Sequence, residues 1–531
     1  MRPQQIPFLK PFKFIPSPYF TQGAPILHIH PNKELLKTVF PDFLFNPQSI
    51  QNIAQFPTFL STIRYFERLT ETYFDAIPFE IQNEFILKRL KQLIEICRVN
   101  PIWKERIDQA IGKEKLNDFE TFSAIPLTDK EIYTDLFSGK RPGMIVPIEN
   151  GNFQIANSGG TASGRSSEIV FSKKELRDTY RWAGNFIGKH IISRYMEEQQ
   201  AKWIGTTLSD SQLWSSGTMV GGVLQEIPNV NYLGIGPMSA KIYQRIMQNP
   251  GQKGFMGIVR DIALLVPYAS ELNDQQKDSL RIALYGSGCL PEKIKSDLKD
   301  IYQNLIILSF FAATQAETIG LQLNPESSIL TAVPGLHLIE IVDKNGKWVQ
   351  ENEEGDLVVT RLFANEAPVL RYRLGDRVIR RPNYTSRFLN SIQFEYVGRS
   401  DDFISLINHQ FYVPHFLTLL SKKLEIDSIF SFNKIAEEFQ FQINQNSETL
   451  NLIIAVSNLY EMKNQYDKHK DKICDIMIRS LIESDKKNTL SHSLFEKLKH
   501  KCQFNIHFVE KESSMIYRTD VGKTPLIYKK Q

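Results

Sequence analysis

The chain has 531 residues, of which 42% are hydrophobic and 23% are charged, and its formal net charge is +4 at pH 7. One small core cannot organise a chain of this length, so two or three domains are expected, and the composition excludes a disordered protein. The net charge is close to zero and the sequence shows no concentrated basic stripe. We therefore expect no nucleic-acid partner.

The first twenty residues mix prolines and lysines among apolar residues, so they predict neither a signal peptide nor a membrane-spanning segment. The cysteines are scattered and lack the paired spacing of a zinc site, which is typical of reduced thiols in a cytoplasmic protein. They are Cys97, Cys289, Cys474 and Cys502. We therefore expect a cytoplasmic protein with no membrane partner, and we leave its oligomeric state open, a dimer included.

An irregular arm rich in proline and phenylalanine opens the chain, and residues 49–99 then follow a helical pattern. Thr128 stands three residues before Glu131, which predicts a capping box at the start of a helix. After residue 400 the character changes, and a segment of about 130 residues predicts a separate α+β unit. We predict an N-terminal arm and helical extension over 1–100, a body over 101–400 and a C-terminal domain over 401–531.

A run rich in glycine, serine and threonine covers residues 158–167, where eight of the ten residues are of these types. Glycine lets the backbone come close to a ligand, and hydroxyl and free N–H groups form a nest for phosphate oxygens. A flexible linker is the alternative, but linkers rarely lead straight into an apolar strand such as residues 168–171. The run matches neither a P-loop nor a dinucleotide fingerprint.

Two units of strand and turn follow in the middle of the chain. Residues 281–285 predict an apolar strand that ends in a glycine turn, and Pro291 then opens a helix. Residues 304–310 predict a second strand, which leads into FFAATQAETIG at 310–320. Alternating strands and helices predict an α/β body with a parallel sheet, whose ligand sites lie beyond the carboxyl ends of the strands.

Six segments of the chain resemble, in order, six motifs of the adenylate-forming enzymes. They are the glycine-rich run at 158–167, the glycine turn after residue 285, FFAATQAETIG at 310–320, RYRLGD at 371–376, YVGRSDD at 396–402 and a lysine after a glycine near the C-terminus. The resemblance is to the branch of the phenylacetate-CoA ligases, and it implies a large α/β domain followed by a small mobile α+β domain. It further implies that the run at 158–167 is a phosphate loop, which binds the triphosphate of ATP. The loop residues are Ser158, Gly159, Gly160, Thr161, Ser163, Gly164 and Arg165, with Ala162 inserted.

The resemblance also assigns roles to the two units of strand and turn. Ser287 and Gly288 would bind adenine, while Tyr285, Gly286 and Phe311 would line the substrate pocket.

In FFAATQAETIG, Thr314 would contact phosphate, and a glutamate would hold magnesium. Gln315 stands where the motif has its carboxylate, and Glu317 lies two residues on. An amide is a poorer magnesium ligand than a carboxylate, so we favour Glu317 over Gln315 as the catalytic metal ligand.

Toward the C-terminus, the resemblance implies that Asp376 bonds the ribose hydroxyls and that Arg399 reaches the ribose or phosphate. A salt bridge in a turn is the alternative for Asp376. Asp401 would be the hinge of the C-terminal domain, and Lys523 would be the catalytic lysine that stabilises charge during adenylation.

The implied reaction uses ATP and Mg²⁺ to activate a carboxylic acid, aromatic or otherwise apolar, as an acyl-adenylate with release of pyrophosphate. The acyl group then passes to a thiol, that of coenzyme A or of an acyl carrier protein. Relatives that use coenzyme A keep a glycine after the hinge, whereas Asn408 and His409 stand here, and we expect His409 to be an exposed polar residue. An amine acceptor and a non-catalytic nucleotide-binding scaffold are the alternatives.

Overall fold

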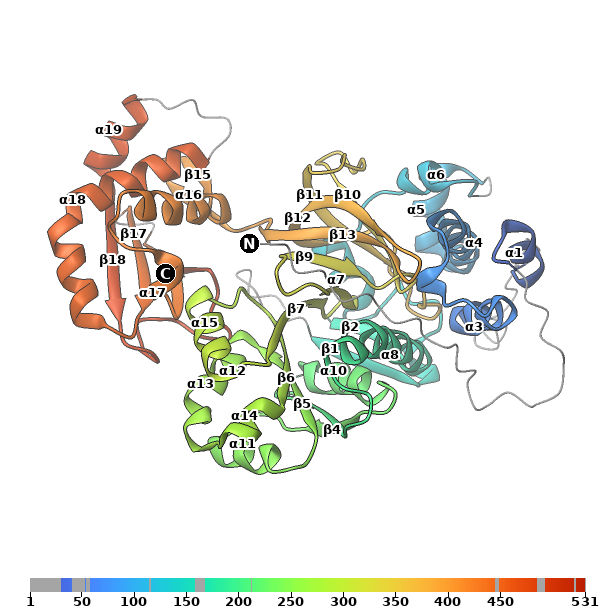
Figure 1. Ribbon diagram of the computed structural model, residues 1–531. Coiled ribbons are helices and arrows are strands. Elements are labelled where there is room, and N and C mark those ends of the chain that lie inside the picture. The colour runs from blue at the N-terminus through green and yellow to red at the C-terminus, as the bar shows by residue number, and fades with distance from the viewer. Residues whose placement is uncertain are drawn as a thin grey trace. The chain divides into compact units, whose positions relative to one another are not determined.

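The computed structural model describes residues 30–40, 53, 58–113, 116–157, 168–211, 213–444, 448–484, 492–519 and 522–530, whose elements are labelled in Figure 1. The chain divides into two compact units. Unit 1 comprises Met1–Gly236, Pro250–Gly254 and Leu308–Tyr396, and unit 2 comprises Pro237–Asn249, Phe255–Ile307 and Val397–Gln531. Among the described residues, no helix is both long and apolar enough to cross a membrane. The predicted boundaries at residues 100 and 400 stay predictions.

The N-terminal part of unit 1 is helical, as the apolar spacing predicts. Its helices are α1 (Lys33–Val39), α3 (Phe59–Thr70), α4 (Phe79–Cys97), α5 (Pro101–Ile111), α6 (Phe119–Ser123) and α7 (Lys130–Phe137). The ring of Phe85 on α4 meets those of Phe66 and Phe74 edge to face, with centroids 4.9 and 5.4 Å apart. Such aromatic pairs add to the stability that burial of the rings provides.

The helix after Thr128 begins differently from the prediction. Asp129, not Thr128, caps α7. Thr128 Oγ1 instead donates to the carbonyl of Leu370 at 2.9 Å, and its backbone exchanges hydrogen bonds with Arg371 and Arg373. The predicted capping box is therefore wrong, because a distant strand takes up the polar groups of Thr128.

Within the described residues, the central sheet has eleven strands in the order β10-β11-β12-β13-β9-β8-β7-β6-β5-β3-β4. The strands are β3 (Lys202–Thr206), β4 (Asn231–Gly234), β5 (Gln252–Ile258), β6 (Leu280–Gly286), β7 (Ile306–Ala313), β8 (Glu317–Gln322), β9 (Ile329–Ala332), β10 (His337–Val342), β11 (Glu354–Arg361), β12 (Tyr372–Thr385) and β13 (Asn390–Arg399). The predicted α/β class is confirmed.

The prediction of a parallel sheet is wrong for the later strands. β3 and β4 pair in parallel, but β7 with β8, β8 with β9, β10 with β11 and β11 with β12 pair antiparallel. No helix lies between any two of the strands from β7 to β13. Parallel neighbours need a long crossover connection, whereas short turns return the chain antiparallel.

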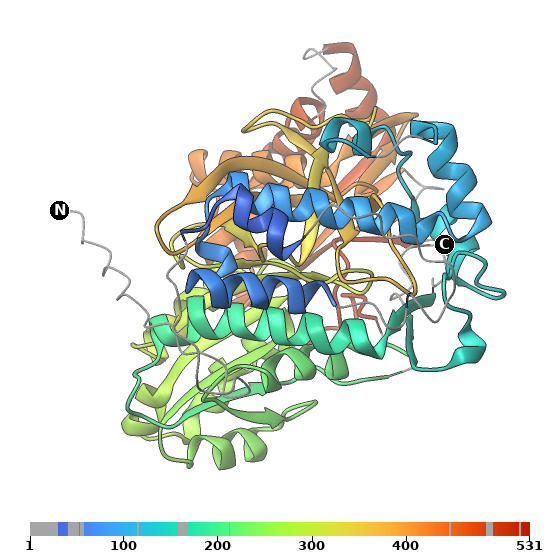
Figure 2. The same ribbon diagram turned by 90° about the vertical axis from the view of Figure 1, so that its right-hand side faces the viewer.

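Helix α8 (Lys173–Ile187) follows β2 (Glu168–Ser172) and continues through a π-helical turn (Gly188–Ile192) into α9 (Ser193–Tyr195). α3 and α8 lie side by side (Figure 2), and the guanidinium of Arg64 stands 5.2 Å from the ring of Trp182. α8 also approaches α10 (Ser216–Gln225) closely, because a Cβ on Gly184 would lie 2.6 Å from the carbonyl oxygen of Val223. Only glycine allows this contact.

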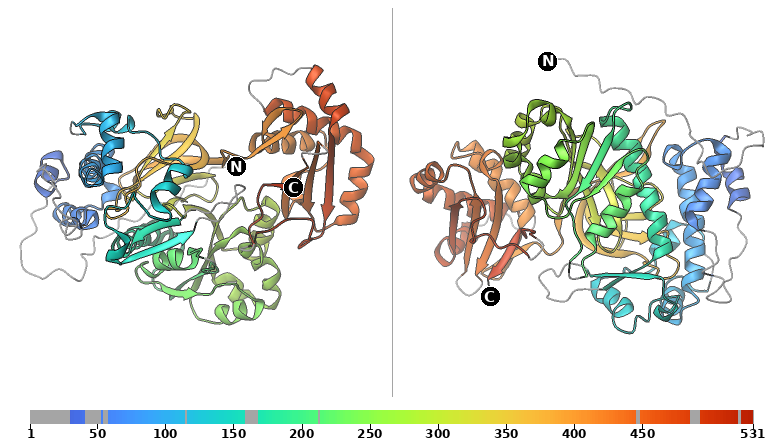
Figure 3. Two further views of the ribbon diagram at one scale, coloured as in Figure 1. Left: turned by 180° about the vertical axis from the view of Figure 1, so that it is seen from behind. Right: turned by 90° about the horizontal axis from the view of Figure 1, so that it is seen from below.

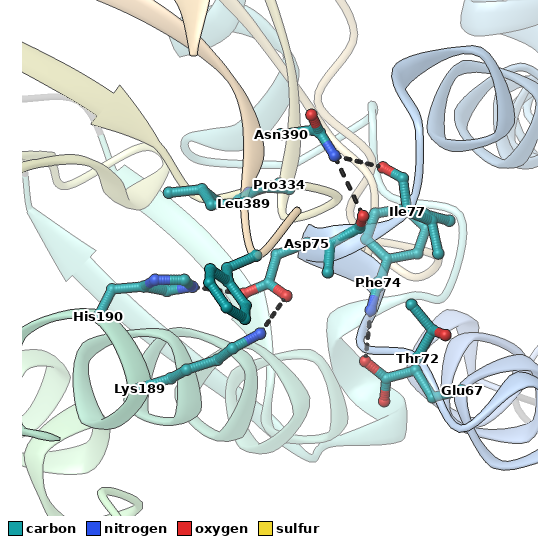
Figure 4. Close-up of polar contacts among 12 residues, drawn as sticks. Glu67, Thr72, Phe74, Asp75, Ile77, Lys189, His190, Pro334, Leu389 and Asn390 are labelled. Carbon is teal, nitrogen blue, oxygen red and sulfur yellow. Dashed lines mark hydrogen bonds and ion pairs between the residues drawn. The ribbon is translucent and has the colours of Figure 1, made fainter. Parts of the chain in front are cut away.

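A buried carboxylate joins the N-terminal helices to α8. Figure 4 shows Asp75 between Lys189 and His190, with Lys189 Nζ 2.6 Å from Oδ1 and His190 Nε2 2.5 Å from Oδ2. Nearby, the side chain of Asn390 donates to the carbonyl of Ile77 at 3.1 Å. Burial alone would raise the pKa of Asp75, but Lys189 and the hydrogen-bonded His190 hold it down at about 2.

Unit 2 combines helices around β6 with the C-terminal region. The first group comprises α11 (Ala240–Met247), α12 (Val259–Ala263), α13 (Leu265–Tyr268), α14 (Asp274–Ser279) and α15 (Glu292–Ile301). The C-terminal elements are β14 (Phe403–Leu406), β15 (His409–Tyr412), α16 (Val413–Ile426), α17 (Phe432–Ile435), β16 (Glu438–Asn444), β17 (Thr449–Ala455), α18 (Leu459–Ser484), α19 (His492–Lys501), β18 (Gln503–Val509) and β19 (Ile527–Lys530).

The C-terminal sheet, drawn in orange and red in Figure 3, has the order β18-β17-β16-β19. The side chains of β17 alternate between its two faces. Leu450, Leu452 and Ile454 of β17 join the core that α16 and α18 complete. Ile453, between them in sequence, packs with Ile516 in a separate small cluster. Alternation along a strand places successive residues on opposite faces. The predicted C-terminal α+β region is confirmed.

We expect Asp75→Asn to destabilise the protein by roughly 3 kcal/mol, because the variant leaves Lys189 and His190 buried without their anion. Since the pKa of Asp75 lies below its ordinary 3.8, its contribution to stability is present above that value and is lost as the pH falls toward 2. Calorimetric unfolding of both proteins at neutral pH measures the difference.

The matched control is Glu80→Gln. Glu80 also pairs with a lysine, Lys33, but both side chains are largely exposed. Exposed pairs contribute about 1 kcal/mol or less. Equal losses in the two variants would show that the burial of Asp75 has no energetic consequence.

Candidate functional site

The predicted phosphate loop, with all its assigned residues from Ser158 to Arg165, lies outside the described residues. The strands that flank it are described: β1 (Phe153–Asn157) pairs antiparallel with β2, so that Asn157 stands opposite Glu168. Arg141 Nη2 lies 2.5 Å from the Glu168 carboxylate, at the point where the chain returns from the loop. The two ends of the loop are therefore held by one pair of strands.

The segment FFAATQAETIG forms the hairpin of β7 and β8. Ala313 pairs with Glu317, which leaves Thr314, Gln315 and Ala316 as a three-residue loop. Glu317 has a φ of 54°, in the left-handed region that glycine usually takes in such hairpins. A glutamate in this conformation costs roughly 1 kcal/mol or more, so specific contacts must hold it there.

The Glu317 side chain is buried, and Thr179 Oγ1 donates to its Oε2 at 2.8 Å. Burial raises the pKa of Glu317 to about 7, while the hydrogen bond from Thr179 and the charge of Arg361 oppose the rise. Gln315 is half-exposed.

Magnesium is compatible with these residues as a nucleotide-bound ion. Within the described part of the chain, no three His, Cys, Asp or Glu side chains form a metal-binding group. Magnesium that travels with a nucleotide usually has one or two protein carboxylates and completes its shell with phosphate oxygens and water. A single glutamate at position 317 would satisfy this pattern.

The sequence analysis missed a buried polar cluster in unit 1, which we call the Arg361 cluster. Its members are Ser172, Glu175, Thr179, Glu317, Arg361 and Glu366, all less than 9% exposed. Burial raises the pKa of Glu175 to about 8, because the loss of water outweighs the attraction of Arg361. One signal was available: Glu175 and Thr179 stand four residues apart, a spacing that places both on one face of a helix.

The first arginine of RYRLGD is a structural residue. Arg371 is 1% exposed, and its guanidinium contacts Glu340 at 2.9 Å and the carbonyls of Ile125 and Gly346 at 2.6 and 3.0 Å. Asp376, at the end of the motif, is also buried in β12, directly after Gly375 with φ 81°. Its binding to ribose stays a prediction.

The predicted pocket residues are divided between the two units: Phe311 belongs to unit 1, and Tyr285 and Gly286 belong to unit 2 with the predicted adenine residues. In unit 1, the ring of Phe311 packs against those of Phe394 and Tyr396, with centroids 6.0 and 5.7 Å apart. In unit 2, Tyr285 is buried at the end of β6, and its ring lies 5.9 Å from Lys295 Nζ. Both rings lie on strands that lead into predicted ligand-binding turns.

The predicted adenine turn follows Tyr285 and Gly286 directly. Ser287 and Gly288 are exposed and have φ values of 64° and 147°, so the backbone of the turn is unusual at both residues. A Cβ on Gly288 would lie 3.5 Å from Val259 Cγ2 at the start of α12. The turn therefore presents bare backbone next to this helix.

At the predicted hinge, the backbone N–H of Arg399 donates to Asp402 Oδ2 at 3.0 Å. Burial raises the pKa of Asp402 to about 6, with this hydrogen bond opposing. Asp401, the predicted hinge residue, has a side chain that is 65% exposed and lies 3.8 Å from Arg399 Nε. The hinge role of Asp401 and the ligand role of Arg399 stay predictions.

The stretch without glycine after the hinge is a tight hairpin between β14 and β15. Ile407 and Asn408 form its turn with φ values of 43° and 66°. These are the left-handed conformations of a type I′ turn, in which asparagine is favourable and a β-branched residue is strained. His409 is half-buried, and its ring stacks on Phe411 with centroids 6.3 Å apart, so the prediction of an exposed side chain is wrong.

Lys523 follows Gly522, whose φ is 75° and whose α-carbon faces α12: a Cβ there would lie 3.1 Å from Arg260 Nη1. The backbone N–H of Lys523 donates to Thr519 Oγ1 at 3.1 Å. Desolvation lowers the pKa of Lys523 to about 8. Gly288 and Gly522 thus both border residues 258–260, so unit 2 brings the predicted adenine turn and the predicted catalytic lysine to one segment.

The chain has the fold of the adenylate-forming ligases. It resembles a 2-hydroxyisobutyryl-CoA ligase in complex with 2-HIB-AMP, with a TM-score of 0.64, 15% identity, and coverage of 86% of this chain and 91% of that one. It also resembles an acyl acid amido synthetase in complex with 2,4-DB, with a TM-score of 0.54, 13% identity, and coverage of 80% and 86%. No family model and no curated protein matches the sequence.

The choice between Gln315 and Glu317 as metal ligand is testable by calorimetric titration of Mg·ATP. We expect Glu317→Gln to weaken Mg·ATP binding about 10-fold, since an amide is a poorer magnesium ligand than a carboxylate, and Gln315→Ala to leave it unchanged. ATP without magnesium is the control ligand. The opposite pattern would assign the metal to position 315, where Gln315→Glu should then tighten binding.

Proposed function

We propose that the protein is an adenylate-forming ligase. It uses ATP and Mg²⁺ to convert a carboxylic acid into an acyl-adenylate with release of pyrophosphate, and it transfers the acyl group to a thiol of coenzyme A or of an acyl carrier protein. The observation that carries the proposal is Lys523: a desolvated lysine with a pKa of about 8, in a loop that borders the same segment, 258–260, as the predicted adenine turn.

The chemistry explains why such a lysine is useful. A carboxylate resists nucleophiles, and transfer of AMP gives it a good leaving group. Negative charge develops around the α-phosphate during this step, and a preorganised cation in a water-poor site stabilises it more strongly than water does. Lys523 would supply that cation, Glu317 would hold the magnesium and Thr314 would contact phosphate. No side-chain nucleophile is required.

The acid is proposed to be aromatic or otherwise apolar. The support is the aromatic group of Phe311, Phe394 and Tyr396 beside the β7–β8 hairpin. An apolar lining favours a ligand that can replace water at little cost.

An amine acceptor is the second candidate. The support for a thiol is the likeness to a CoA ligase, and the support for an amine is the likeness to an acyl acid amido synthetase. The strained Ile407–Asn408 turn stands where relatives that use coenzyme A keep a glycine, which favours testing amines and carrier proteins beside coenzyme A.

Pyrophosphate release in the presence of Mg·ATP and panels of aryl, fatty and amino acids tests the proposal. We expect release with one class of acid, and a decrease of roughly 10²- to 10³-fold in Lys523→Ala, the usual cost of one charge-stabilising group. Because the charged lysine is required and its pKa is about 8, wild-type activity should decrease as the pH rises through 8. Lys523→Arg should remove this decrease.

Lys511→Ala is the matched control, because Lys511 is an exposed lysine near the same loop. Its activity and pH profile should equal those of the wild type. ATP binding without pyrophosphate release from any acid would reject the ligase and favour the non-catalytic scaffold.

A further inference from the structure

The Arg361 cluster connects segments that are far apart in sequence. Arg361 is the last residue of β11, and its Nη2 donates to the carbonyl of Val170 on β2 at 3.2 Å and to the carbonyl of Ala367 at 2.9 Å. The same guanidinium meets Glu175 in the first turn of α8, with Nε 2.9 Å from Oε1 and Nη2 3.0 Å from Oε2. It also lies 4.2 Å from the ring of Phe171. One side chain therefore joins β2, α8 and the chain after β11.

A second set of contacts runs from the same helix to the β7–β8 hairpin. Glu175 and Thr179 are four residues apart, so they share one face of α8. Thr179 holds the Glu317 carboxylate. The buried ring of His337 is hydrogen-bonded to the backbone of Ala316 in the same loop. The loop that carries Thr314 and Gln315 is thus fixed from two sides.

The start of α8 is fixed as well. Ser172, the last residue of β2, caps the helix by accepting from the backbone N–H of Glu175 at 3.1 Å, and it donates to Glu366 Oε2 at 2.9 Å. The carbonyl of Glu366 accepts from the backbone N–H groups of Ile145 and Val146. Strand β2 therefore cannot shift along α8 without breaking buried hydrogen bonds.

Burying this many charged groups costs free energy, so the cluster is poorly suited to a purely stabilising role. Three buried carboxyl groups, those of Glu175, Glu317 and Glu366, lie near one another, and the buried guanidiniums of Arg361 and Arg89 are the cations that act on them. Replacing such a buried group of charges with apolar residues is often neutral or stabilising. A guanidinium nevertheless offers a planar array of donors with a fixed geometry, which apolar residues cannot reproduce. That geometry suits a role in positioning.

We infer that Arg361 is a positioning residue: together with Glu175 it aligns strand β2, into which residues 158–167 lead, with the β7–β8 hairpin that carries Thr314 and Glu317. The inference rests on the proposed function for its catalytic consequence. Arg361 acts through other residues and contacts neither substrate nor magnesium. Its effect is to keep β2 and the β7–β8 hairpin in a single arrangement before the nucleotide binds.

The test compares the wild type with Arg361→Lys and with the double variant Arg361→Met/Glu175→Leu. The double variant removes both charges, so its melting temperature should stay near or above that of the wild type. Its kcat for pyrophosphate release should nonetheless fall roughly 10- to 100-fold, as when an orienting partner is lost, while KM for the acid stays unchanged. Arg361→Lys keeps a charge without the planar array and should not rescue kcat.

Hydrogen exchange gives a second measurement that needs no activity. In the double variant, amides over 168–172 and 312–322 should exchange faster than in the wild type, while amides over 438–455 in unit 2 should not change. Asp75→Asn serves as a control for lost stability in unit 1, because it removes a buried charge away from the cluster. It should leave kcat unchanged, and any faster exchange should extend over unit 1 as a whole and should not be confined to these two segments.

The outcomes separate the two proposals. Wild-type kcat and exchange in the double variant, or in Arg361→Lys, would overturn the positioning role. Faster exchange in a protein whose wild type releases no pyrophosphate with any acid would support the positioning role and reject the proposed function. Unchanged exchange in that case would reject both.

Discussion

The burial of arginine side chains is the interaction on which much of unit 1 depends. Removing a guanidinium from water is expensive unless acceptors meet its N–H groups, so each buried arginine sets the positions of several carbonyl or carboxylate groups. Arg89 of α4 binds the carbonyl of Leu362 and the side chain of Asn365. Arg361 binds the carbonyl of Val170 and the carboxylate of Glu175. Arg371 binds the carbonyl of Ile125 and the carboxylate of Glu340. The N-terminal helices, β2 and the segment around Thr128 therefore all contact the chain between residues 361 and 371.

Several residues other than glycine adopt the left-handed backbone conformation at the predicted motifs. Ser287, Glu317, Arg371 and Ile407 all have φ values between 43° and 64°. Each such conformation costs free energy and persists only where surrounding contacts impose it. For Arg371 and Glu317 those contacts are visible, as the pair with Glu340 and the hydrogen bond from Thr179. The motifs are thus places where tertiary structure overrides local backbone preference.

Desolvation acts with opposite signs on the buried carboxyl groups of unit 1 and on the predicted catalytic lysine of unit 2. It raises the pKa values of Glu175 and Glu317, and it lowers that of Lys523. Both effects favour the neutral form of the group.

The sequence by itself determined the α/β class, the C-terminal α+β region, the helical stretch that contains α3 and α4, and strands β2, β6 and β7, because apolar periodicity and turn residues are local signals. It also indicated the segments at 285–288 and 314–317 as turns of unusual chemistry, whereas residues 372–376 of RYRLGD lie in strand β12. The sequence could not show that Thr128 serves a distant strand, nor that the strands after β7 pair antiparallel, since both depend on which segments meet in space.

Only the tertiary structure decided the role of the polar residues on α8. From the pattern alone, Glu175 and Thr179 belong to an ordinary amphipathic helix, and Arg361 is one arginine after a buried strand. Their burial together makes them a cluster, because a charge removed from water must find partners, and those partners come from four separate segments of the chain. Long-range electrostatic pairing of this kind leaves no periodic trace in a single sequence.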